Sequence, residues 1–137
     1  MRHLGLDYGE KRIGIAVSDP EGKIAFPKEV IFNKGNKKVF AKLKSLINEE
    51  KISKIVIGLP ISLGGQETGQ TKEMRNFTDF LKKAIDLPVE FENEMFTTKI
   101  TKQGGVKKEY RDASAAAIIL QSYLDKENSK FKDRNAK

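Results

Sequence analysis

The sequence predicts an α/β fold: a mixed five-stranded sheet, three antiparallel strands followed by parallel strands, with helices on both faces. Three short apolar segments joined by tight turns come first, and turns of this kind join antiparallel strands. Two further apolar segments each follow a segment of helical periodicity, which predicts parallel strands reached by right-handed crossovers. A chain of 137 residues is long enough to bury the core of one such domain.

The first three strands are expected at His3–Tyr8, Arg12–Asp19 and Lys23–Phe32. The second alternates isoleucine and valine with glycine, alanine and serine, which is the period of two that a strand requires. Short polar turns at residues 9–11 and 20–22 separate the three. Pro27 lies inside the third strand and predicts either an edge position or a bulge there.

The second half of the chain alternates helices and strands. Asn36 is expected to cap the first helix, and Asn93 and Asp112 to open the last two. The expected elements are a helix to about Glu50, a strand Ile52–Leu59, a glycine-rich loop Pro60–Gly69, a helix from Thr71, a strand Leu87–Glu92, a helix from Glu94 to Gly104-Gly105, and a final helix. We expect one domain over residues 1–125 and a basic, flexible tail over residues 126–137.

Composition excludes several kinds of active site. The chain has no cysteine and a single histidine, His3, so disulfides, thiolate zinc sites, cysteine nucleophiles and histidine-rich metal sites are excluded. A metal bound here would be a hard cation held by oxygen ligands. No apolar run approaches the roughly 20 residues of a membrane span, and the N-terminus lacks the apolar core of a signal peptide. We therefore expect a cytoplasmic protein with no membrane partner.

The net charge of +7 is concentrated in two segments. Residues 99–111 carry five basic side chains and one acidic, and residues 126–137 carry five basic and two acidic. The rest of the chain is neutral. A basic loop and a basic end favour a polyanionic partner such as nucleic acid, whereas the alternative is a solvated loop and a frayed terminus.

Asp7 stands at the end of the first predicted strand, where a buried carboxylate is costly unless it is paired. Strand alternation puts it between Gly5 and Gly9 on one face, and glycine in a strand often marks close approach by a ligand or another backbone. A metal ion bridging to a phosphate would fit that space. The alternative is that Asp7 caps the turn.

Two more acidic positions are candidates. Glu90, Glu92 and Glu94 alternate along the fifth strand, and Glu94 lies where that strand ends, which is where ligands bind in parallel sheets. Asp112 precedes an alanine-rich helix, where its alternative role is to interact with the helix dipole. Three carboxylates on three elements could converge on one or two divalent ions.

Four segments resemble, in order, the four conserved blocks of the YqgF/RuvX family of the RNase H-like superfamily: GLDYGEKRIGIAVSD, VIGLPISLGGQETGQT, FENEMFTT and RDASAAAIILQSYLD. The resemblance covers nearly the whole chain to about Asp125. It implies an RNase H-like fold and a nuclease of pre-16S ribosomal RNA 5′-end maturation, or a Holliday junction resolvase. It also implies that Asp7, Glu94 and Asp112 are the acidic triad. Asn93 and Met95 replace the aspartate and arginine that the third block usually shows.

These implications lead to a metal-dependent hydrolase that uses Mg²⁺ or Mn²⁺ and acts on phosphodiester bonds. Its partner would be pre-rRNA, structured DNA or a ribosomal precursor particle, and RNA and DNA present the same phosphate. The residues expected to touch nucleic acid are Lys11, Arg12, Gly64, Gly65, Lys107, Lys108 and Arg111. A non-catalytic RNA-binding or ribosome-binding module is an alternative function. A kinase-type ATPase, which also opens with Gly-x-Asp-x-Gly, would need a second domain to close over its nucleotide.

Overall fold

The computed structural model of the protein describes residues 1–59, 69–93 and 108–135, and for residues 69–71, 93, 108–112 and 130–135 it describes the backbone alone. The elements are β1 (Arg2–Asp7), β2 (Arg12–Ser18), β3 (Ala25–Phe32), α1 (Asn36–Glu50), β4 (Ile52–Leu59), α2 (Gly69–Ala84), β5 (Val89–Asn93) and α4 (Lys108–Asn135). The helix expected from Glu94 and most of the glycine-rich loop lie outside these residues.

The five strands form one mixed sheet in the order β3-β2-β1-β4-β5. β1 pairs antiparallel with β2, and β2 pairs antiparallel with β3, whereas β1, β4 and β5 are mutually parallel. This confirms the predicted fold class. β3 is an edge strand, and its pairing with β2 shifts register opposite Pro27, so both explanations offered for that proline are correct.

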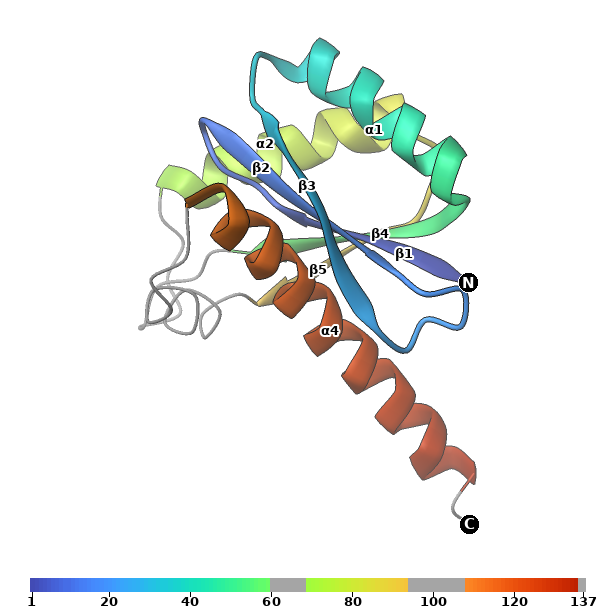
Figure 1. Ribbon diagram of the computed structural model, residues 1–137. Coiled ribbons are helices and arrows are strands. Elements are labelled where there is room, and N and C mark those ends of the chain that lie inside the picture. The colour runs from blue at the N-terminus through green and yellow to red at the C-terminus, as the bar shows by residue number, and fades with distance from the viewer. Residues whose placement is uncertain (60–68, 94–107, 136–137) are drawn as a thin grey trace.

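Helices cover both faces of the sheet (Figure 1). α1 and α2 pack on one face over a core of large aliphatic and aromatic side chains. α4 crosses the other face, where its alanine-rich side meets Ala16 and Val56. The smaller side chains on this second face let the helix lie close to the strands. In the part of the chain that the structure describes, no helix is long and apolar enough to cross a membrane.

Three helix ends differ from the expectation. α1 is preceded by Gly35, with φ of 107°, and no side chain caps it, so Asn36 is the first helical residue and not its cap. α4 begins at Lys108, four residues before Asp112. The dipole effect fades within the first turn, so Asp112 is not the cap that the sequence predicted. α4 also continues through residues 126–135, the segment expected to be a flexible tail.

Gly5 sets the distance between β1 and α4. A Cβ at Gly5 would stand 2.9 Å from the Cβ of Leu120 and 3.0 Å from the carbonyl oxygen of Ala116. Separations this short force the neighbouring atoms to shift, and one of the two atoms belongs to the helix backbone. The glycine is therefore required by the approach of a helix.

The first prediction tests this contact. Gly5→Ala should lower the free energy of unfolding by about 1–3 kcal/mol, because the added methyl group forces α4 away from the sheet. Urea unfolding of the two proteins measures the difference. Equal stabilities would show that α4 shifts at no cost and that Gly5 does not set its position.

His3, near the start of β1, is buried on the same face of the sheet, the one that α4 covers. Its side chain lies beside Tyr123, with the ring centroids 5.8 Å apart, and its Nδ1 has no hydrogen-bond partner among the described residues. Burial, and secondly the positive charge of Lys54, lower the pKa of His3 from its usual 6.5. The folded protein therefore holds this imidazole neutral where the unfolded chain would protonate it.

The second prediction follows from that difference. Because the unfolded chain binds the extra proton, the contribution of His3 to stability is complete above about pH 6.5 and is lost as the pH falls through the lower folded pKa. His3→Phe removes the titration. The variant should lose less stability than wild type between about pH 7 and pH 5, by urea unfolding. Parallel losses in both proteins would contradict the prediction.

Candidate active site

The carboxyl ends of three parallel strands lie together at one end of the sheet. Their last residues are Asp7 in β1, Leu59 in β4 and Asn93 in β5. Leu59 pairs with Asn93, and Leu6 pairs with Ile57, so the three ends lie at nearly the same level. Ligands of α/β sheets gather beyond the carboxyl ends of parallel strands. Asp7 therefore lies where the topology favours a binding site.

Two glycines flank Asp7 on the neighbouring strands. Gly14 of β2 is the cross-strand partner of Asp7. On the other side, the pairing of Leu6 with Ile57 brings Gly58 of β4 alongside. Asp7 thus stands in a row between two residues without side chains, and its own side chain is half-buried.

Gly5 and Gly9, which the sequence suggested as the space for a ligand, have other roles. Gly5 admits α4 to the surface of the sheet. A Cβ at Gly9 would lie 2.5 Å from the carbonyl oxygen of Arg12, so this glycine is required by the tight β1–β2 turn. Of the two kinds of close approach that such a glycine can mark, by a ligand or by another backbone, the second is the one found at Gly5 and Gly9.

α4 brings Asp112 toward this edge. Along β1, His3 meets Tyr123 and Gly5 meets Leu120 and Ala116, so the helix runs back toward its N-terminus as the strand runs toward Asp7. Asp112 precedes Ala116 by four residues, which is about one helical turn. The backbone register is therefore consistent with Asp112 near Asp7, although the side chain of Asp112 lies outside the description.

Glu94 immediately follows the last residue of β5 and lies outside the described residues. The other two acidic residues of that strand are already engaged. Glu92 is 5% exposed, and its Oε1 lies 2.6 Å from Nζ of Lys126 in α4. This ion pair joins a buried carboxylate to a mostly exposed lysine and links α4 to β5.

Glu90 is half-exposed, but it has partners. The Tyr123 hydroxyl donates a hydrogen bond to its carboxylate, and Nζ of Lys54 lies 3.6 Å from the same oxygen. The hydrogen bond to Tyr123 raises the pKa of Lys54, and burial raises the pKa of Tyr123. This network also fastens α4, near its middle.

The available donors suit a hard cation. Within residues 1–59, 69–93 and 108–135, no group of three acidic or histidine side chains could hold a metal, because the proposed partners of Asp7 fall outside the described side chains. The candidate metal ligands at this end of the sheet are nevertheless all carboxylates. The chain has no cysteine, and its one histidine, His3, precedes Asp7 by four residues in β1. Carboxylate oxygens are the ligands that Mg²⁺ and Mn²⁺ prefer.

Two of the expected nucleic-acid contacts are described in full. Lys11 is exposed at the β1–β2 turn, and Arg12 follows it at the start of β2. Asn33 holds this turn: its backbone N–H donates to the carbonyl oxygen of Lys11 at 2.8 Å, and its Nδ2 donates to that of Gly9 at 3.1 Å. Lys108 and Arg111 begin α4, with only their backbones described, whereas Gly64, Gly65 and Lys107 fall outside the description.

Gly14 and Gly58 were not among the residues predicted from the sequence. Each is an isolated glycine inside a strand that is otherwise rich in isoleucine and valine. Such a glycine often marks a close approach. That signal was available, but only the pairing register reveals that both glycines flank the same aspartate.

Comparison with known proteins identifies the family. A family model described as RuvX, Holliday junction resolvase, matches residues 1–126. A protein of Sulfurihydrogenibium sp. named "Putative pre-16S rRNA nuclease" is 46% identical over 133 residues, covering 91% of this chain and 90% of its own length. A protein of Maridesulfovibrio salexigens with the same name is 37% identical over 132 residues, covering 90% and 98%.

Solved structures share the fold at low sequence identity. RuvC of Thermus thermophilus aligns with a TM-score of 0.62 at 14% identity, covering 94% of this chain and 97% of its own. The fowlpox virus resolvase, solved with Holliday junction DNA, aligns with a TM-score of 0.57 at 10% identity, covering 92% and 98%. These likenesses confirm the RNase H-like fold that the sequence predicted. Because the family model matches residues 1–126 and the relatives match about nine-tenths of the sequence, the chain belongs to the RuvX family.

Proposed function

We propose that this protein is a metal-dependent nuclease that hydrolyses phosphodiester bonds in the 5′-end maturation of pre-16S rRNA. One observation carries the proposal. Asp7 is the last residue of the central strand, β1. β5 ends at the same end of the sheet and is followed directly by Glu94. α4, which carries Asp112 in its second turn, crosses the face of the sheet on which Asp7 lies. The names of the relatives support the choice of substrate.

Asp7, Glu94 and Asp112 would hold Mg²⁺ or Mn²⁺ through their carboxylate oxygens. Divalent ions in such a site supply positive charge to the phosphate and lower the pKa of the attacking water. In the reaction, the oxygen of water forms a bond to phosphorus, the bond from phosphorus to the leaving oxygen breaks, and that oxygen takes up a proton. Gly14 and Gly58, which carry no side chains, flank Asp7 where the phosphate would bind.

The basic residues would bind the strand on either side of that phosphate. Arg12 and Lys11 extend from the turn that Asn33 holds, so they are positioned by the sheet. Lys107, Lys108 and Arg111 precede Asp112 along the chain and would neutralise phosphates next to the site. Gly64 and Gly65 would contribute backbone N–H groups.

Resolution of Holliday junctions is the second candidate, favoured by the description of the family model. A panel of substrates separates the two: pre-16S rRNA with its 5′ extension, an unrelated structured RNA, single-stranded RNA and a four-way DNA junction, each with Mg²⁺, Mn²⁺ or EDTA. Metal-dependent cleavage of the precursor rRNA alone is expected. Symmetrical cutting of the junction alone would favour the resolvase, and no cleavage of any substrate would favour a binding module.

The third prediction concerns Asp7. Clustered carboxylates repel one another when no cation is bound, and neutralising one relieves that repulsion. Asp7→Asn should therefore abolish cleavage and leave the metal-free protein at least as stable as wild type. It should also reduce the rise in melting temperature that Mg²⁺ produces by binding the native state. Melting curves with and without Mg²⁺, beside the cleavage assay, measure all three effects.

Asp19→Asn is the matched control. The Asp19 carboxylate accepts hydrogen bonds from the backbone N–H groups of Lys23 and Ile24, and these bonds lower its pKa. Its loss should reduce stability and spare both cleavage and the Mg²⁺ response. If Asp7→Asn behaves like this control, Asp7 is a turn cap and the triad assignment fails.

The fourth prediction concerns the basic segment. Changing Lys107, Lys108 and Arg111 together to alanine should weaken RNA binding regardless of sequence. It should also flatten the salt dependence of binding to a single strand, by about 0.7 log units of slope for each phosphate that is no longer neutralised. The matched control replaces Lys44, Lys82 and Lys83, three exposed lysines of α1 and α2 on the opposite face of the sheet. An equal change of slope in both variants would indicate only an effect of net charge.

A further inference from the structure

We infer that Phe32, with Arg12, forms a stacking platform for an unpaired nucleobase that flanks the cleaved phosphate. The inference rests on the proposed nuclease function and adds a requirement to it: the substrate must be single-stranded on the side of the site toward β3. None of the residues that would hold the metal takes part.

Phe32 is a large aromatic side chain that is exposed to solvent near the proposed active site. It is the last residue of β3 and is 54% exposed. Its cross-strand partner is Arg12, whose guanidinium carbon lies 6.0 Å from the centre of the ring. Asn33, the next residue, is bonded to the β1–β2 turn, so the backbone below the ring is fixed. An exposed ring beside an arginine is the arrangement on which single-stranded nucleic acids stack.

The ring lies on the same face of the sheet as Asp7. Asp7 pairs with Gly14, and Gly14 pairs with Val30 of β3, and residues paired across strands share a face. Two strand spacings separate Asp7 from Val30, about 10 Å. Gly14 between them has no side chain, so nothing from β2 rises between the aspartate and β3. Phe32 lies two residues beyond Val30, toward the edge.

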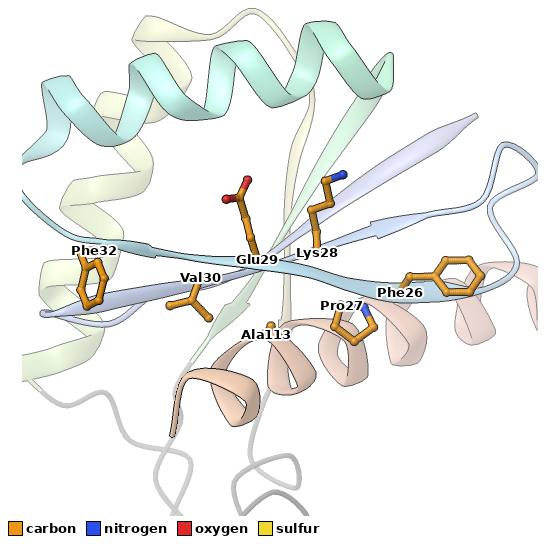
Figure 2. A pocket seen from close by; sticks show the side chains of 7 residues that line it. All are labelled: Phe26, Pro27, Lys28, Glu29, Val30, Phe32 and Ala113. Atoms are coloured by element: carbon orange, nitrogen blue, oxygen red, sulfur yellow. The ribbon is translucent and has the colours of Figure 1, made fainter. Parts of the chain in front are cut away.

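A groove connects this ring to α4. It has a volume of about 450 Å³, and its lining includes Pro27, Val30, Phe32 and Ala113, the residue after Asp112. Figure 2 shows Pro27, Val30 and Phe32 directed toward α4, with Ala113 on the helix opposite, whereas Lys28 and Glu29 project to the other face. Lys28 and Glu29 are engaged there, in ion pairs with Glu50 and Lys42. Among the described side chains that line the groove, those on the α4 side, Pro27, Val30, Phe32 and Ala113, are therefore apolar.

The surroundings favour a nucleic acid as the occupant. Arg12 and Lys11 bring two positive charges to one end of the groove, suited to the phosphates on either side of a stacked base. Ala113, the residue after Asp112, lines the groove from the side of α4. A strand with its phosphate at Asp7 would thus meet an aromatic face next, and an apolar ring gives no affinity to phosphate or sugar but does bind a base.

Tryptophan fluorescence tests the contact directly. The protein has no tryptophan, so Phe32→Trp introduces a single reporter at the platform. In EDTA, which prevents cleavage, oligoadenylate should quench this fluorescence, whereas an abasic oligonucleotide of equal length should not. Phe80→Trp is the matched control. Phe80 is 53% exposed and has Nζ of Lys83 at 5.9 Å from its ring centre, but it belongs to α2 on the other face. Its fluorescence should stay unchanged.

Affinity measures the contribution of the ring. Phe32→Ala and Phe32→Leu should each weaken binding of oligoadenylate by about 5- to 150-fold, and Phe32→Trp should not, because stacking requires an aromatic side chain. Binding of the abasic strand should be unchanged in all three variants. Melting curves verify that each variant is folded, as expected for an exposed position.

The outcomes separate this inference from the proposed function. Cleavage of RNA by wild type, together with unchanged oligoadenylate binding by Phe32→Ala, would overturn the platform alone. Quenching at Phe32→Trp without cleavage of any substrate by wild type would sustain a binding platform and overturn the nuclease. A change in sedimentation mass on Phe32→Ala, with nucleic-acid binding unchanged, would overturn the inference in favour of a contact between two copies of the chain.

Discussion

The close contact between β1 and α4 at Gly5 is the constraint on which the candidate site depends. The helix backbone lies so near the strand that no side chain fits between them. That contact fixes both the height of α4 above the sheet and its register along β1. The register then determines that the second turn of α4, and not a later one, lies toward the end of the strand that carries Asp7.

The two faces of the sheet are built for different purposes. The face under α1 and α2 is filled with leucine, isoleucine and phenylalanine, which supply most of the burial that stabilises the fold. The face under α4 carries glycine and alanine at its centre and polar attachments toward the C-terminal half of the helix, where Lys126 meets Glu92 and Tyr123 meets Glu90. The described attachments between α4 and β5 thus lie in the C-terminal half of the helix, away from Asp112.

The proposed metal site and the proposed base-stacking site lie on the same face of the sheet. A single row across the sheet runs through Val30, Gly14, Asp7, Gly58 and Glu92. The Asp7 carboxylate lies at the centre of this row. The ion pair of Glu92 with Lys126 lies at one end, and the groove lined by Phe32 lies at the other. Among the described residues around this row, those on the side of β3 offer both apolar surface and positive charge. A bound nucleic-acid strand would therefore extend toward β3.

Local patterns were enough to predict the fold class, the pairing directions of the strands and the three acidic candidates, because strand alternation, helical periodicity and turns are all written in neighbouring residues. They also placed Pro27 in an irregular edge strand. The folded chain was needed to establish which glycines flank Asp7 across the sheet, why residue 5 is a glycine, and where α4 begins. Those features depend on pairs of residues far apart in the chain, such as Gly5 with Leu120 and Asp7 with Gly14. A local pattern contains no information about register between elements, since register is set by packing.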